Sequence, residues 1–179
     1  MARELKGSQT EKNLWTAFAG ESQARNKYTF YAQVAKKEGY EQMSGIFTET
    51  ADQEIQHAKK IFRFLNGIGD TKQNLEDAKE GEKYEWETMY RNFEKVARQE
   101  GFTEIAEFFH EVAEVEEEHE KRFQRLLNNL TNGTVFKKEE EVEWQCRNCG
   151  YVHTGLEAPE VCPCCDHPQA HFQLYPKNY

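Results

Sequence analysis

Apolar residues recur every three or four positions over most of the chain, from about residue 9 to residue 131. That period is typical of amphipathic helices, and helix-ending residues divide it into segments. We predict helices over 8–37, 41–66, 72–99 and 102–130, the first beginning with a capping box of Ser8 and Glu11. The breaks fall at Gly39, at the loop 67–72 and at Gly101. Four long helices joined mostly by short turns favour an antiparallel bundle.

The second half of this helical region resembles the first. The segment VARQEGF (96–102) repeats VAKKEGY (34–40) at an offset of 62 residues. The pair Glu116-x-x-His119 repeats Glu54-x-x-His57 at the same offset, whereas EGEK (80–83) matches AGES (19–22) one position out of register. The pattern therefore predicts a duplicated helical hairpin.

Ionisable residues interrupt the apolar face of every predicted helix. Counted from Gly39 and Gly101, at about 1.5 Å of rise per residue, they all lie about 22–29 Å from the turn of their hairpin. They should therefore meet at one level, and the i, i+3 spacing places each Glu and His pair on one face. The seven residues are Glu21, Glu54, His57, Glu82, Glu85, Glu116 and His119.

Five carboxylates at one level of a core repel one another, and each is expensive to bury as an ion. Two divalent cations would turn that liability into ligation, and this ligand pattern is that of di-iron carboxylate bundles. Oxygen-rich ligation with two imidazoles suits iron or manganese. A single Glu-x-x-His pair is usually part of a solvated surface. Here two such pairs lie on apolar faces, at the same level as the acids of the other two helices, and this argues against that interpretation. We expect solvent to surround Glu114, Glu117, Glu118 and Glu120, and His110, His153, His167 and His171 to be structural.

The composition changes after residue 133. We predict three parts: a bundle over 1–133, a charged linker over 134–143 and a small cysteine-rich domain over 144–179. The last part is too small to be held by apolar burial alone, so a metal should stabilise it. Two C-x-x-C knuckles, Cys146 with Cys149 and Cys162 with Cys165, form a four-thiolate site for iron or zinc. Cys164 falls outside that spacing and is expected to be a bystander.

Composition and charge exclude several classes of protein. Charged residues make up 31% of the chain and its formal charge is −9, which argues against a nucleic-acid-binding zinc ribbon. No stretch has the apolar length of a signal peptide core or a membrane span. We therefore expect a cytoplasmic protein in which paired cysteines bind metal rather than form disulfides.

Five segments resemble the rubrerythrin family over nearly the whole chain: GES (20–22), EIQH (54–57), GEKYEWETMY (81–90), EVEEEH (114–119) and CRNCGYVH (146–153). The resemblance implies a mainly α protein, with a ferritin-like four-helix di-iron bundle followed by a rubredoxin-like iron domain. It implies a peroxidase that reduces hydrogen peroxide to water in oxidative-stress defence. Electrons would come from a rubredoxin or an NAD(P)H-linked reductase, and the chain would form a head-to-tail homodimer. A ferritin-like ferroxidase or iron-storage protein, and a non-enzymatic metal or redox sensor, are the alternatives.

The resemblance also implies roles for single residues. Glu54 and Glu116 would bridge two irons, with Glu21, Glu82 and His119 as terminal ligands. Glu85 and His57 would be alternative ligands of one iron that exchange with its redox state. Tyr28 and Tyr90 would hydrogen-bond near the carboxylates, although a role as plain core aromatics is equally open. One departure is Asp166, which stands where a rubredoxin knuckle usually has Gly and should adopt a left-handed backbone.

Overall fold

The computed structural model describes residues 4–178. The chain divides into two compact units, Met1–Gly69 and Asp70–Tyr179, and each is described by itself. Long helices make up the first unit and most of the second, and a small sheet lies at the C-terminal end. The long helices followed by a small sheet confirm the predicted fold class, a mainly α protein with a small C-terminal module. No helix in the range 4–178 has the length and apolar character needed to cross a membrane.

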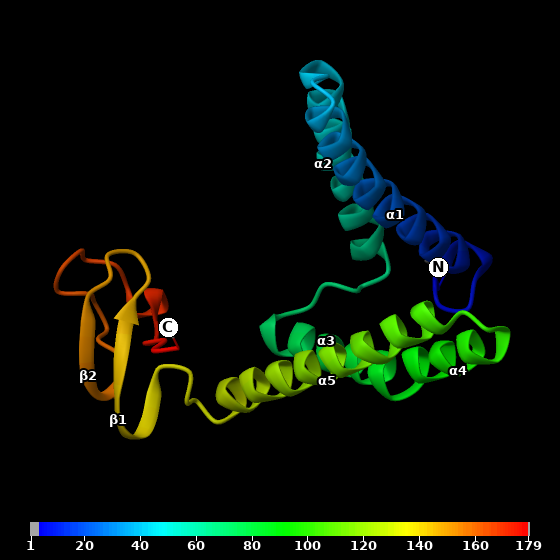
Figure 1. The fold of residues 1–179 in the computed structure, drawn as a ribbon. Coiled ribbons are helices and arrows are strands. Elements are labelled where there is room, and N and C mark those ends of the chain that lie inside the picture. The colour runs from blue at the N-terminus through cyan, green and yellow to red at the C-terminus, as the bar shows by residue number, and fades with distance from the viewer. Residues whose placement is uncertain (1–3, 179) are drawn as a thin grey trace. The chain divides into compact units, whose positions relative to one another are not determined.

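The first unit is an antiparallel pair of helices, which we call hairpin one (Figure 1). It consists of α1 (Gln9–Lys37) and α2 (Glu41–Phe64). Small side chains fill the contact between the two helices, among them the buried Ala35, Ala51 and Ala58. Alanine lets two helix axes approach closely, and the buried Ser44 hydroxyl donates to the Ala32 carbonyl at 2.9 Å. The small residues therefore fix the pairing of α1 with α2.

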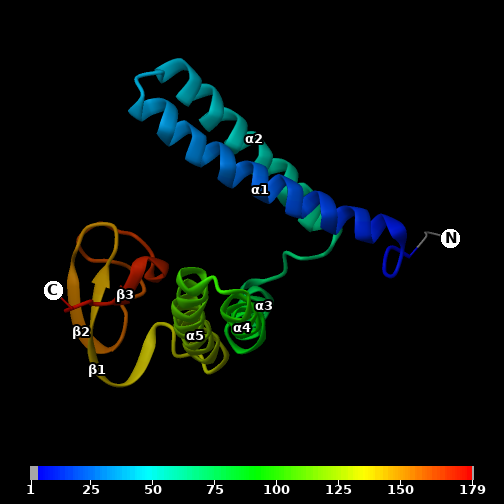
Figure 2. The same ribbon diagram turned by 45° about the vertical axis from the view of Figure 1, so that its right-hand side comes forward.

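The second unit begins with another antiparallel pair, hairpin two (Figure 1 and Figure 2). One arm consists of α3 (Thr71–Tyr84), a π-helical turn at Glu85–Met89 and α4 (Tyr90–Glu100). The other arm is α5 (Thr103–Thr131). Ala97, Ala106 and Ala113 are buried along the contact, in the manner of hairpin one. The predicted helix over 72–99 is correct in extent, but the π turn was not predicted.

The long helices end with the same backbone arrangement, the Schellman motif. After α1, the Tyr40 N–H donates to the Ala35 carbonyl at 2.8 Å, and after α4 the Phe102 N–H donates to the Ala97 carbonyl at 2.9 Å. Gly39 and Gly101 supply the left-handed residue with φ of 86° and 85°. A glycine adopts this conformation without the strain that a side chain would add. The duplicated VA-x-x-EG segments therefore encode equivalent turns.

The first helix of each hairpin begins with a side-chain cap. The Ser8 hydroxyl accepts from the Glu11 N–H at 3.1 Å, as predicted. The return bond of the predicted capping box is different, because the Glu11 carboxylate accepts from the Gly7 N–H rather than from Ser8. A complete capping box occurs instead at the start of α3, between Asp70 and Gln73.

The C-terminal module is a three-stranded antiparallel sheet in the order β2-β1-β3. Its strands are β1 (Lys137–Cys146), β2 (Val152–Glu157) and β3 (Phe172–Leu174), with a 3-10 turn at Gln169–His171. Trp144 is fully buried at its centre beside Cys146, Cys162 and Phe172. Strand β1 begins within the segment 134–143 that we predicted as a linker. Two of the four cysteines thus form part of the core of the module.

Candidate metal centres

Hairpin one brings Glu21 of α1 together with Glu54 and His57 of α2. The His57 Nδ1 lies 2.9 Å from Glu54 Oε2 and 3.8 Å from Glu21 Oε1. One ligand atom from each residue falls within 4.8 Å of the other two. Three of the predicted ligands therefore converge, with Glu54 mostly buried and His57 exposed. We call this group trio one.

Hairpin two repeats the arrangement with Glu82 of α3 and with Glu116 and His119 of α5. The His119 Nδ1 lies 2.6 Å from Glu116 Oε2 and 3.8 Å from Glu82 Oε1. These ligand atoms also lie within 4.8 Å of one another. We call this group trio two. The duplication seen in the sequence is therefore a duplication of a three-residue group that could hold a metal ion.

Mutual repulsion and burial shift the pKa values of these carboxyls. A hydrogen bond with Glu54, and then burial, raise the pKa of Glu21, while the same hydrogen bond and one with His57 lower the pKa of Glu54. In trio two, burial and then the charge of Glu116 raise the pKa of Glu82. In each trio one carboxyl, Glu21 or Glu82, is thus less readily ionised than usual. A bound cation would favour its ionised form.

Glu85 is the predicted ligand that the structure leaves outside the close trios. It is the first residue of the π turn, and burial followed by repulsion from Glu116 raises the pKa of its carboxyl. The Tyr90 N–H donates to the Glu85 carbonyl five residues back, which defines the π turn. Glu85 therefore lies in the electrostatic field of trio two, and its role as a ligand stays a prediction.

The π turn explains the one-residue mismatch in the internal repeat. Eighteen residues separate Glu21 from Gly39, and nineteen separate Glu82 from Gly101. Tyr28 and Tyr90, by contrast, each precede the glycine of their turn by eleven residues. The extra residue consequently lies between Glu82 and Tyr90, where the structure has Glu85–Met89 in π geometry. Such a turn is a single-residue insertion into a helix, and it is often found at functional sites.

The two tyrosines predicted near the carboxylates have different surroundings. Burial, and then the charges of Glu85, Glu116 and Glu82, raise the pKa of Tyr90. Its hydroxyl therefore lies within the field of the carboxylates. Tyr28 packs its ring against Tyr31 and Phe47, with ring centroids 6.3 Å and 6.2 Å away. A functional role for either tyrosine stays a prediction.

Trp86 and Glu120 form a contact that sequence reasoning missed. The Trp86 indole N–H donates to Glu120 Oε2 at 2.7 Å, from the π turn to α5. Glu120 is half-buried, so our expectation that solvent surrounds it was wrong. The indole supplies a buried hydrogen-bond donor, and this compensates the carboxylate for lost water. The only sequence signal for this pairing was a tryptophan inside an acidic segment.

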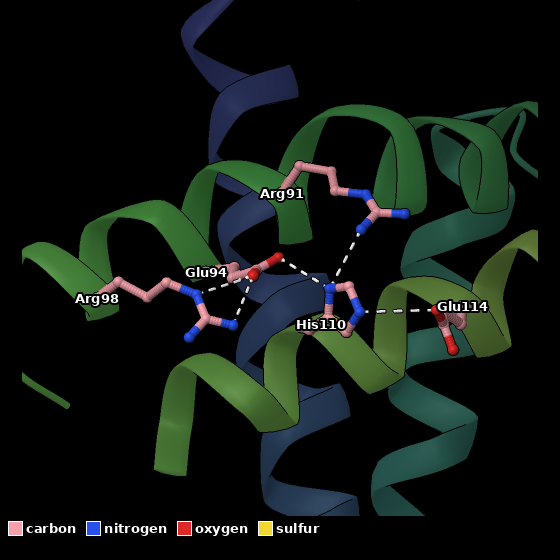
Figure 3. A network of polar contacts seen from close by, with 5 residues as sticks. All are labelled: Arg91, Glu94, Arg98, His110 and Glu114. Atoms are coloured by element: carbon pink, nitrogen blue, oxygen red, sulfur yellow. Dashed lines mark hydrogen bonds and ion pairs between the residues drawn. The ribbon is translucent and has the colours of Figure 1, made fainter. Parts of the chain in front are cut away.

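A second polar network lies nearer the turn of hairpin two (Figure 3). His110 Nδ1 lies 3.2 Å from Glu94 Oε2, and Arg98 donates to Glu94 Oε1 at 2.9 Å through its Nη2. The other ring nitrogen of His110 lies 3.6 Å from Glu114. The bond from Arg98 and then that from His110 lower the pKa of Glu94, although burial opposes them. His110 is therefore a structural residue that links α4 to α5, as predicted.

The four predicted cysteine ligands converge in the C-terminal module. Cys146 Sγ lies 3.8 Å from Cys165 Sγ, and Cys149 Sγ lies 3.6 Å from Cys162 Sγ. A metal bound at about 2.3 Å by four tetrahedral thiolates places the sulfurs about 3.8 Å apart, whereas a disulfide needs about 2.05 Å. The geometry is that of a metal site. Cys164 is exposed and belongs to no such group among residues 4–178.

The two cysteine knuckles have the same backbone geometry. The Gly150 N–H donates to the Cys146 carbonyl, and the Asp166 N–H donates to the Cys162 carbonyl, both at 2.9 Å. Gly150 has a φ of 82° and Asp166 a φ of 58°, so Asp166 adopts the predicted left-handed conformation. Burial would raise the pKa of the Cys165 thiol, but hydrogen bonds, foremost that from the His167 N–H, lower it to about 6. These hydrogen bonds thus favour the thiolate form of Cys165.

The donor atoms fit iron at both places. Each trio offers two carboxylates and one imidazole, which is the oxygen-rich set of a non-haem iron, and the cysteine module offers four thiolates. Fold and donor sets together define a helical carboxylate metalloprotein with two irons in the helical part and one in a four-thiolate module.

Comparison with known proteins then identifies the family. Residues 12–127 match the family model of rubrerythrin, and residues 144–173 match that of the rubrerythrin rubredoxin-like domain. The chain belongs to the rubrerythrin family. It is 52% identical to rubrerythrin of Porphyromonas gingivalis over an alignment of 192 residues, which covers 100% of this chain and 96% of the relative. It is 50% identical to rubrerythrin of Nitratidesulfovibrio vulgaris, over 99% of this chain and 100% of the relative.

Among solved structures, the chain is similar to partially reduced nigerythrin. The two are 30% identical, and the match covers 98% of this chain and 92% of the other with a TM-score of 0.36.

Proposed function

We propose that this protein reduces hydrogen peroxide to water, with electrons that enter through the four-thiolate site. The observation that carries the proposal is the presence in one chain of two equivalent carboxylate–imidazole trios and a redox-capable thiolate site. The overall reaction is H2O2 + 2 e⁻ + 2 H⁺ → 2 H2O. Trio one and trio two together would hold the two irons that supply these two electrons.

The residues of the chain have three tasks in this reaction. The six residues of the two trios would hold the metal pair, Glu54 and Glu116 among them. Glu85 offers an additional carboxylate beside trio two. The Tyr90 hydroxyl, whose pKa is raised by burial and by the nearby carboxylates, stays protonated and would donate a hydrogen bond to a peroxide oxygen. Glu85, which lies outside the two trios and whose pKa is raised, is the carboxyl that would pass protons to the product.

The cysteine module serves as the electron entry. The four thiolates would hold a single iron and so supply one-electron chemistry, and each peroxide would then require two transfers. Cys149 is exposed, and its sulfur would give an external donor a short path into the site. The donor is a rubredoxin or an NAD(P)H-linked reductase. In a head-to-tail homodimer, the module of one copy serves the carboxylate centre of the other.

The proposal is tested with iron-loaded protein, a reduced rubredoxin and measured amounts of peroxide. We expect two electrons to be consumed for every peroxide, with water as product and no release of dioxygen. Dioxygen release would instead identify a catalase reaction. Absence of donor-driven peroxide consumption, together with uptake of many irons per chain under dioxygen, would favour the ferroxidase or storage alternative.

A further inference from the structure

Each hairpin carries only half of a metal centre. Trio one lies entirely within Met1–Gly69 and trio two entirely within Asp70–Tyr179. Four helices are needed to complete the set of ligands for two ions. The carboxylate centre therefore requires a hairpin one and a hairpin two to pack together, and the question is whether both come from one chain.

Both hairpins have an apolar face that a partner must cover. In hairpin two, a groove of about 530 Å³ at the turn end is lined by Phe93, Val96, Ile105 and other apolar residues. Val96 and Ile105 are each about half exposed. In hairpin one the equivalent side chains of Val34 and Met43 are exposed to a similar degree. Faces this apolar are unfavourable in water and indicate a contact surface.

The connection between the hairpins is very short. Only residues 65–70 separate the end of α2 from the start of α3. The Gly67 N–H donates to the Phe62 carbonyl at 2.9 Å, and Asn66, with a φ of 55°, completes the Schellman motif that ends α2. Asp70 belongs to the capping box of α3. The two helix-end motifs therefore hold Asn66, Gly67 and Asp70, half of the six-residue connection.

A ferritin-like bundle needs a much longer connection. In that topology one long crossover runs along the bundle between the second and third helices, because these two helices point in the same direction. With the two trios at one level, the end of α2 lies about 15 Å to one side of that level and the start of α3 about 16 Å to the other. The crossover must then span about 31 Å along the bundle, besides the lateral separation of the helices.

Six residues cannot cover that distance. Fully extended, the seven Cα steps from Phe64 to Thr71 reach about 25 Å at most, and only if both helix caps are broken. The alignment with the Porphyromonas gingivalis relative runs over 192 positions, whereas this chain has 179 residues, so the relative contains about 13 residues that this chain lacks. The ferritin-like bundle therefore cannot close within one chain while its helix ends stay intact.

We propose that two copies of this chain exchange hairpins, so that hairpin one of each copy packs on hairpin two of the other. Each of the two metal centres in the dimer then takes trio one from one copy and trio two from its partner. The inference rests on the two-ion centre of the proposed function, but not on its peroxide chemistry. The occupant of the apolar groove of hairpin two is, in this arrangement, hairpin one of a second copy.

Complementation between two inactive variants tests the exchange. Glu54→Ala destroys trio one and Glu116→Ala destroys trio two, so neither variant alone forms an intact centre. When the two variants are co-expressed with different tags and the mixed dimer is purified, one of its centres combines the intact trio of each copy. We expect the mixed dimer to hold about half of the wild-type bundle iron, whereas each variant alone holds almost none.

Two matched controls define the result. Two differently tagged copies of Glu54→Ala should show no rescue of iron binding. Insertion of about 13 Gly and Ser residues between Ile68 and Gly69 permits closure within a chain, and we expect it to reduce the rescue. Glu21→Ala with Glu82→Ala gives a second complementing pair if either first variant folds poorly.

The outcomes separate the two proposals. A mixed dimer without rescued iron, while the wild-type protein holds its bundle iron, overturns the exchange and leaves the proposed function standing. Rescued iron without peroxide reduction supports the exchange and overturns the proposed function. A wild-type protein that is monomeric and holds about two bundle irons per chain also overturns the exchange, since its hairpins must then pair within the chain.

Discussion

His119 Nδ1 and Glu116 Oε2 lie 2.6 Å apart on successive turns of α5, and His57 and Glu54 repeat this contact on α2 at 2.9 Å. Each imidazole is thus oriented by the carboxylate three residues before it. Side chains held in this way can bind a metal with little further loss of conformational freedom. From this contact we predict how the removal of one carboxylate changes metal binding.

We expect Glu116→Ala to lose both bundle irons, because Glu116 is proposed as a ligand that the two ions share. Donor-driven peroxide turnover should fall by at least about 100-fold, since even outer-shell changes at metal sites lose about 10–100-fold. Iron analysis, visible spectra and peroxide assays measure these effects. Glu118→Ala, which changes an exposed carboxylate paired with Lys121, is the matched control and should retain both iron and activity.

Cys149→Ser should separate electron entry from peroxide chemistry. A hydroxyl is a poor replacement for a thiolate, so the visible bands of the four-thiolate iron should disappear. Donor-driven turnover should then be lost, whereas chemically reduced bundle iron should still react once with peroxide. Cys164→Ser is the control, because that thiol lies outside the four-sulfur group. Undiminished donor-driven turnover in Cys149→Ser would show that electrons enter elsewhere.

Deletion of Glu87 should convert the π turn into ordinary α-helix. Because the π turn absorbs one extra residue, its removal leaves Glu82 in the register that Glu21 has in hairpin one and moves chiefly Glu85, which lies within the turn. We expect bundle iron to be retained and donor-driven peroxide turnover to fall, with helical content unchanged in circular dichroism. Glu87→Ala keeps the chain length and the exposed position, so its turnover should be normal. Wild-type turnover in the deletion variant would show that the π turn is dispensable.

Glu94→Gln should destabilise the protein at neutral pH and have progressively less effect in acid. The hydrogen bonds from Arg98 and His110 lower the folded-state pKa of Glu94. A carboxyl with a lowered folded pKa contributes stability above its unfolded pKa, and this contribution is lost as pH falls through the folded value. The difference in unfolding midpoint between the variant and the wild type should therefore shrink below pH 4.5, the ordinary value.

The same measurement on Glu111→Gln supplies the comparison for Glu94. Glu111 is an exposed neighbour of His110 on α5, outside the network in Figure 3. We expect little change in its unfolding midpoint across this pH range. A Glu94→Gln effect that stayed constant down to pH 3 would mean that the network does not depend on the carboxylate charge.

The trios were predictable from the sequence because their signals are periodic and local. An i, i+3 pair fixes Glu116 and His119 on one face, and a count from Gly101 gives their level. The π turn left only a one-residue mismatch in the repeat, which helical periodicity cannot place within the segment. The contact of Trp86 with Glu120 joins different helices, and so it leaves no pattern along the chain.

Hairpin one depends on contacts between residues close in sequence, joined by the tight turn at Gly39. Structures with such local contacts form quickly. Hairpin one is complete by residue 64, so trio one can form before the second pair of helices has been translated. The bundle irons are then expected to bind only once a hairpin two is available, which places their uptake late in biogenesis.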